Sequence, residues 1–128
     1  DLWGANLSEL KLSKINFFGA NLSSANLSQT NLSAANLGEA KLSGTNLSKA
    51  NLSGANLNRA NLSSANLSQA NLSGANLRQA NLESANLDWA NFNKANIRGT
   101  DFWKVKMRRV ILPNGKIHSS GKHIEWFS

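Results

Sequence analysis

Residues 66–85 read NLSQANLSGANLRQANLESA, which is four successive five-residue units that each begin with Asn-Leu and end with Ala. The unit extends outward in both directions. Stepping by five from Leu2 to Leu112 gives 23 positions, and all are apolar. They are leucine except for Phe17, Phe92, Ile97, Phe102 and Met107. An internal repeat of this kind decides the fold before any helix or strand is sought.

A second row of small residues lies two positions before each apolar residue. From Ala5 to Val110 it holds 15 Ala, three Thr and four larger residues, with Asn at most of the intervening positions. An amphipathic helix needs apolar residues at i, i+3, i+4 and i+7, which this spacing does not supply. Side chains alternate across an extended strand, so very short strands would point Ala and Leu inward and Asn outward.

The chain must turn within the two residues that follow each central apolar residue. Six of the nine glycines stand at the second of these positions: Gly4, Gly19, Gly44, Gly54, Gly74 and Gly99. A type II turn needs a positive φ at its third residue, which glycine adopts without strain. Turns at every fifth residue would keep all the leucines on one axis.

The units Ala20-Asn21-Leu22-Ser23-Ser24 and Ala70-Asn71-Leu72-Ser73-Gly74 resemble the A-(N/D)-L-x-x unit of the pentapeptide repeat family, over about residues 1–112. The resemblance implies an all-β fold, a right-handed quadrilateral β-helix with four five-residue sides per coil, so that residues twenty apart stack. About 23 units then make five to six coils. The domains expected are a β-helix over 1–112 and a C-terminal turn and capping tail over 113–128.

The leucine row is the predicted core, because each buried large apolar side chain contributes about 1.5–3 kcal/mol. Alanine in the second row is expected for steric reasons in a narrow interior. Its larger members are predicted to plug the two ends: Leu10, Ile15, Val105 and Val110. The core leucines are Leu22, Leu27, Leu32, Leu37, Leu42, Leu47, Leu52, Leu57, Leu62, Leu67, Leu72, Leu77, Leu82 and Leu87. The outward asparagines either form stacked amide ladders or face water.

The tail leaves the period at the turn Pro113-Asn114-Gly115. We expect Ile117, Ile124, Trp126 and Phe127 to fold over the C-terminal end. No comparable cap precedes Leu2, so end-to-end self-association through the first coil is a further expectation.

Groups with catalytic or metal-binding chemistry are few. The absence of cysteine excludes a disulfide framework, a thiolate zinc site and a cysteine nucleophile. His118 and His123 are five residues apart in the tail, with Glu125 nearby, and are interpreted as ordinary polar tail residues. The serines occupy turn positions without a partnered histidine. We therefore predict that the protein is not an enzyme and that it has no catalytic residue, no metal and no cofactor.

The net charge of +7 comes from 14 basic and 7 acidic side chains. Stacking at twenty residues pairs Asp88 with Arg108, Glu39 with Arg59 and Trp89 with Arg109, and brings together the like charges of Arg78 and Arg98. Segment 94–109 is the most basic. The predicted binding residues are Arg78, Arg98, Lys104, Lys106, Arg108, Arg109, Trp89 and Trp103. The alternative is that these charges only solubilise the rod and shield its last edge.

The favoured function is a non-catalytic structural or interaction scaffold that presents flat polar walls to a protein partner. The alternative is binding of nucleic acid or another polyanion through the basic C-terminal end, with affinity that falls steeply with salt. Some members of the family resemble duplex DNA and bind type II topoisomerases, but that mimicry needs an acidic surface. Ice binding is a remote option, because the outer rows are Asn and Ser rather than Thr.

The compartment stays open between cytoplasmic and exported. No apolar run approaches the roughly 20 residues that span a bilayer, so a soluble chain without membrane insertion is expected. The chain begins at Asp1 without a visible signal-peptide pattern, which leaves open whether a leader was removed. The resembled family is abundant in cyanobacteria and has members in both compartments.

Overall fold

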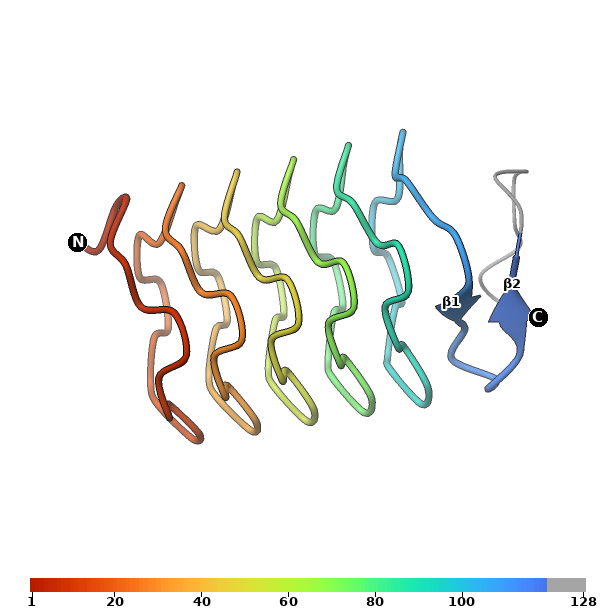
Figure 1. Cartoon of the computed structure of the whole chain (residues 1–128), viewed down its shortest axis with the longest axis horizontal. Coiled ribbons are helices and arrows are strands. Elements are labelled where there is room, and N and C mark those ends of the chain that lie inside the picture. Colours follow the sequence, from red (N-terminus) through yellow and green to blue (C-terminus); the bar gives the residue numbers. More distant parts are fainter. Residues whose placement is uncertain (120–128) are drawn as a thin grey trace.

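The computed structural model describes residues 1–119. The chain winds into a rod of stacked coils, with the N-terminus at one end and the strands β1 (Val110–Ile111) and β2 (Ile117–His118) at the other (Figure 1). Parallel bridges join each coil to the next at a spacing of twenty residues, as in Asn46↔Asn66 and Asn66↔Asn86. Twenty residues hold four five-residue units, so the coil has four sides.

Each side of the coil stacks on the same side of its neighbours to build a wall. The first wall is centred on Leu2 and its equivalents as far as Phe102, and the second runs from Leu7 to Met107. The third runs from Leu12 to Leu112 and the fourth from Phe17 to Ile97. The second and fourth walls face opposite directions, because a coil passes through the four in order.

Every wall carries three columns of outward side chains. We call the residue before the central apolar residue the amide column, the residue after it the middle column, and the next residue the corner column. Within a column, neighbours are twenty residues apart in sequence and one coil apart in space. The twenty-residue register therefore decides which surface side chains are neighbours.

Backbone hydrogen bonds hold the coils together in both directions. The Leu47 N–H donates to the Asn66 carbonyl at 2.7 Å, and the Asn66 N–H donates back to the Thr45 carbonyl at 2.9 Å. The corner residue also takes part, since the Lys49 N–H donates to the Ser68 carbonyl at 2.9 Å. Each side is too short for a long strand, so the sheet is a stack of single bridges.

The corners are β-turns closed between the central apolar residue and the next inner residue, as where the Ala50 N–H donates to the Leu47 carbonyl at 3.0 Å. All six glycines at corners have positive φ, between 64° and 73°, which confirms the prediction for those positions. Sixteen other corners have φ between 52° and 65° without being glycine. A positive φ costs a residue with a Cβ roughly 1–2 kcal/mol, so the stack must offset strain at most corners.

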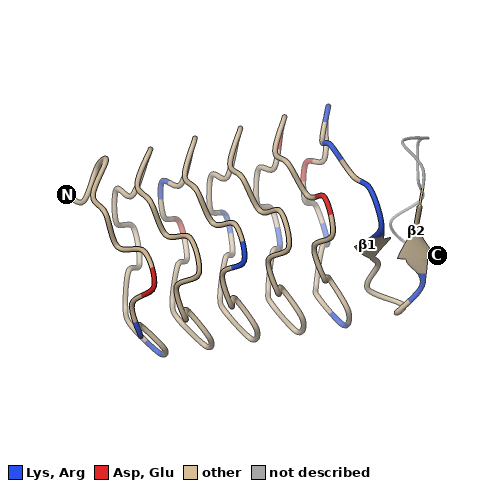
Figure 2. Ribbon diagram, in the orientation of Figure 1, with Lys and Arg blue, Asp and Glu red and all other residues tan. Residues whose placement is uncertain are grey.

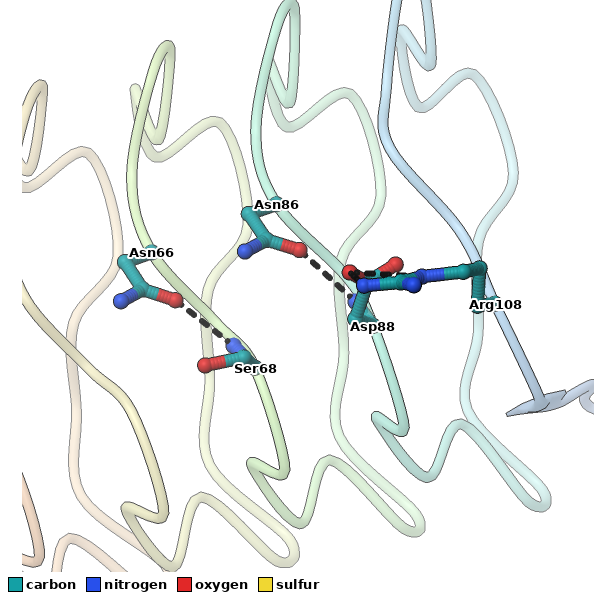
Figure 3. A network of polar contacts seen from close by, with 5 residues as sticks. All are labelled: Asn66, Ser68, Asn86, Asp88 and Arg108. Atoms are coloured by element: carbon teal, nitrogen blue, oxygen red, sulfur yellow. Dashed lines mark hydrogen bonds and ion pairs between the residues drawn. The ribbon is translucent and has the colours of Figure 1, made fainter. Parts of the chain in front are cut away.

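Asparagine has a structural role that the amide-ladder hypothesis did not anticipate. Its side-chain oxygen accepts the N–H of the residue two positions later. The Ser48 N–H donates to Asn46 Oδ1 at 3.0 Å, and the Ser68 N–H donates to Asn66 Oδ1 at 3.0 Å (Figure 3). This Asx turn fixes the start of the corners that follow an asparagine. Amide-to-amide bonds between asparagines occur in the described chain only on the fourth wall.

The interior is an axis of stacked apolar side chains. The fourteen leucines from Leu22 to Leu87 are each 0% exposed, and the alanines beside them are buried too. Phe92 extends the axis and meets Phe102 edge-to-face, with ring centroids 6.3 Å apart. The threonines of the inner row satisfy their hydroxyls, as where Thr45 Oγ1 donates to the Leu22 carbonyl at 3.0 Å.

The two ends of the rod differ. Val110 is fully buried in β1, which pairs antiparallel with β2, whereas Leu10 in the first coil is 43% exposed. Ile15 and Val105 are partly buried. The plug roles of these residues stay predictions, as does self-association through the first coil. The expected capping residues Ile124, Trp126 and Phe127, together with His123 and Glu125, lie outside the described residues.

A matched pair of corner substitutions on the third wall tests the strain at positive φ. Ala34 has φ 55°, and Gly54 has φ 65° with no atom within 4 Å of a Cβ added there. We expect Ala34→Gly to raise the free energy of unfolding by about 1 kcal/mol and Gly54→Ala to lower it by a similar amount. Urea denaturation of the two variants measures both changes, and changes of the same sign would contradict the corner geometry.

Candidate interaction surface

The structure divides the predicted binding residues among three walls. Arg78 and Arg98 occupy the middle column of the fourth wall. Lys106, Arg108, Arg109 and Trp89 belong to the second wall, which faces the opposite direction, and Trp103 and Lys104 belong to the first wall. Lys and Arg residues lie along the whole rod and not only near β1 (Figure 2). The eight residues therefore do not form one patch.

Arg108 is held by a carboxylate on the preceding coil. Its Nη2 and Nε lie 3.0 and 3.3 Å from Asp88 Oδ2, as predicted from the twenty-residue spacing (Figure 3). The Asp88 side chain is only 8% exposed, whereas the Arg108 side chain is 70% exposed. Asp88 Oδ1 is buried and has no hydrogen-bond partner among the described residues. This pair joins the last coil to the rod.

Arg109 and Trp89 form a second predicted contact. The Arg109 guanidinium carbon lies 5.0 Å from the Trp89 ring centroid, within cation–π range. Trp89 is still 56% exposed, so the contact leaves much of the indole in water. A backbone hydrogen bond joins the same two coils, since the Trp89 N–H donates to the Arg108 carbonyl at 2.8 Å.

Acidic residues balance much of the charge at the C-terminal end of the first and second walls. Trp103 is 64% exposed, and its N–H donates to Asp101 Oδ1 at 2.9 Å. Glu83 stands one coil before Trp103 in the same column. The four basic residues of this region are Lys104, Lys106, Arg108 and Arg109, and the three acidic ones are Glu83, Asp88 and Asp101. The end therefore has little excess charge.

The third and fourth walls carry most of the positive charge instead. Their basic residues are Lys11, Lys14, Arg59, Arg78, Lys94 and Arg98, and their acidic residue is Glu39 alone. The excess is five positive charges over the described residues of these walls. Counting charges along the sequence missed this distribution, because it indicated segment 94–109 as the most basic region. A count by wall, which the twenty-residue period already permitted, would have found it.

On the fourth wall, Arg78 and Arg98 stand in neighbouring coils, as the Gln79 N–H donates to the Arg98 carbonyl at 2.9 Å. Neither guanidinium forms an ion pair with any residue between 1 and 119. The predicted Glu39–Arg59 contact is present at 3.8 Å, between side chains that are about half exposed. Arg78 and Arg98 are therefore two neighbouring guanidiniums on one wall without an ion pair in the described part of the chain.

Phe18 lies in the same column at the N-terminal end of the rod. Its Cδ2 would be 3.0 Å from a Cβ added at Gly38, so the ring rests on the wall where glycine leaves room. Phe18 is 56% exposed. The predicted binding residues did not include Phe18, although the twenty-residue period places it in the column of Arg78 and Arg98.

Within residues 1–119, no three His, Cys, Asp or Glu side chains gather into a set that could hold a metal ion. His118 belongs to β2, and its predicted companions His123 and Glu125 lie outside the described residues. No helix in the described part of the chain is long and apolar enough to cross a membrane.

Comparison with known families matches the pentapeptide repeat model to residues 1–33, 35–74, 60–99 and 75–112. The chain belongs to the pentapeptide repeat family. Members fold as right-handed quadrilateral β-helices, and the four-sided coil of this pentapeptide repeat protein has that architecture. The comparison with curated proteins gave no match.

Two solved pentapeptide repeat structures from cyanobacteria are similar to the chain. HetL from Nostoc sp. strain PCC 7120, a protein involved in heterocyst differentiation regulation, is 34% identical with a TM-score of 0.75. The match covers 91% of this chain and 63% of HetL, so the chain spans less than two thirds of that protein. Rfr23 from Cyanothece 51142 is 35% identical with a TM-score of 0.55, over 83% of this chain and 86% of Rfr23.

Two acid-to-serine substitutions compare how much each of the two stacked ion pairs contributes to the stability of this pentapeptide repeat protein. We expect Asp88→Ser to lower the free energy of unfolding by about 1 kcal/mol, because it removes a well-aligned partner from Arg108 while leaving that arginine in water. Hydrogen exchange of the Trp89 amide should become faster. Glu39→Ser should change the stability by at most about 0.3 kcal/mol, since both groups of its pair are exposed. Equal effects of the two changes in urea denaturation would contradict this assignment.

Proposed function

We propose that the protein is a non-catalytic scaffold whose walls dock a protein partner. The observation that carries the proposal is a set of large aromatic side chains on otherwise flat polar walls. Trp3 is 67% exposed, Trp103 64%, and Phe18 and Trp89 56% each. Exposed aromatic residues and arginine are enriched in protein interfaces, where they anchor contacts at low entropic cost.

The rod is well suited to hold such anchors in place. Hydrogen bonds to neighbouring coils fix the backbone beneath each outward column, and Asx turns fix the corners. A partner that binds a rigid wall loses little additional order in the scaffold itself. The similarity to HetL, which is involved in heterocyst differentiation regulation, is consistent with a binding role.

Residues 1–112 supply the docking walls in this proposal, and the turn at residues 113–115 followed by β2 (Ile117–His118) lies at their C-terminal end. Polyanion binding at the basic C-terminal end is the weaker alternative. Asp88 is already paired with Arg108, and Asp101 and Glu83 lie near Trp103, so a nucleic acid would meet carboxylates there. The C-terminal end is accordingly better suited to a mixed-charge contact than to a phosphate backbone.

Affinity capture with the purified chain tests the scaffold function. The chain is immobilised and incubated with an extract of the organism that encodes it, and each retained protein is purified and titrated against the free chain. We expect at least one direct partner whose affinity falls about tenfold or more when the wall aromatics are replaced in Phe18→Ser or Trp103→Ser. Ser53→Ala on the third wall, which has no aromatic anchor, is the matched control.

The proposal fails if the intact rod retains no protein that binds directly. It also fails if the purified chain turns over a substrate at an enzymatic rate and that activity, rather than a partner, depends on these residues.

A further inference from the structure

The fourth wall contains two rows of side chains that are tied together along the rod. In the amide column, Asn76 Nδ2 donates to Asn56 Oδ1 at 3.5 Å, and Asn56 Nδ2 donates to Asn36 Oδ1 at 3.2 Å. In the corner column, Arg59 pairs with Glu39 at 3.8 Å and its Nε donates to Gln79 Oε1 at 2.9 Å. These rows, which we call the rails, hold both edges of the wall over several coils.

The middle column between the rails consists of Phe18, Gly38, Asn58, Arg78 and Arg98. It has an apolar end, where the Phe18 ring rests on Gly38, and a cationic end, where Arg78 and Arg98 have no ion pair within the described chain. The column is therefore a strip with an aromatic anchor at one end, two guanidiniums at the other and neutral groups between them.

The spacing of the strip matches an extended peptide. Coils are about 4.8 Å apart, so the backbone positions of Arg78 and Arg98 lie roughly 14 and 19 Å from that of Phe18. An extended chain advances about 3.3 Å per residue and points alternate side chains to the same face. An apolar residue at position i would therefore face Phe18, while residues i+4 and i+6, about 13 and 20 Å away, would face Arg78 and Arg98.

We infer that the strip between the rails binds an extended segment of a protein partner, with an apolar residue followed at i+4 and i+6 by acidic residues. This inference rests on the proposed scaffold function and names its wall and the chemistry of its partner. Guanidinium groups pair with carboxylates through two parallel hydrogen bonds, which gives the strip a preference for Glu or Asp at these two positions. Glu39 lies beside Arg59 in the corner column and is not paired with Arg78 or Arg98 within residues 1–119.

A protein segment fits the strip better than a nucleic acid does. Affinity for a phosphate backbone grows with the number of neutralised phosphates, and tight complexes use several such contacts. The column offers two unpaired cations, and the Glu39 carboxylate lies beside the path between Phe18 and Arg78. Charge complementarity is thus confined to one end of the strip.

A fluorescein-labelled probe peptide, Leu-Ser-Ser-Ser-Glu-Ser-Glu, tests the inference by anisotropy titration of the full chain at low salt. We expect binding that weakens at least about tenfold when both arginines are neutralised in Arg78→Gln/Arg98→Gln, and about threefold or more in Phe18→Ser. Lys41→Gln/Lys49→Gln removes the same charge from the exposed positions of the first and second walls and should change the affinity less than about twofold. Circular dichroism confirms that each variant is folded.

The inference is overturned by no binding of the probe, by equal binding to Arg78→Gln/Arg98→Gln, or by equal binding of a permuted peptide with glutamate at the second and third positions. Tighter binding of a thymidine oligonucleotide that is lost in Arg78→Gln/Arg98→Gln also overturns it in favour of a nucleic acid. A captured partner that binds this variant as tightly as the native chain leaves the scaffold function intact and refutes the strip. Specific probe binding without any captured partner supports the strip and refutes the scaffold function.

Discussion

Each coil of the rod is held by backbone hydrogen bonds that only the neighbouring coils can provide. A five-residue side makes too few contacts within itself, so the Leu47 N–H and the Asn66 N–H both depend on an adjacent coil. The leucine axis and the inner alanines fix the register of these bonds, because a shifted coil would place polar residues inside. The positive-φ corners then keep every coil at twenty residues, and all outward columns follow from that number.

The fold could be predicted because its period recurs over almost the whole chain, and stacking at twenty residues correctly paired Asp88 with Arg108 and Trp89 with Arg109. The role of asparagine was missed, since Asn66 could form an Asx turn or an amide ladder with no difference in the sequence. The positive φ at corners such as Ala34 was also not predicted, because a glycine in the sequence indicates that conformation and an alanine does not.

Prediction of the site was less successful for a physical reason. Charge was counted along segment 94–109, but a solenoid places residues of one segment on different walls. Arg98 and Arg108 are close in sequence, yet they lie on opposite walls, and Asp88 pairs with the second of them alone. Phe18 and Arg78 are far apart in sequence and share a column. The surface of such a protein has to be considered column by column, and each wall can then differ in charge and anchors while the interior is unchanged.

The register of twenty residues is tested most directly by disulfide formation, because the chain has no cysteine of its own. Ser23 and Ser43 occupy neighbouring positions in one column, with their Oγ atoms 3.4 Å apart. Oxidation of Ser23→Cys/Ser43→Cys should give an intramolecular disulfide in nearly all molecules, since a coil spacing of about 4.8 Å suits the bond. Ser23→Cys/Ser48→Cys, which joins different walls, should give little. Efficient bonding of the second pair and not the first would contradict the stacking on which the walls and the binding strip depend.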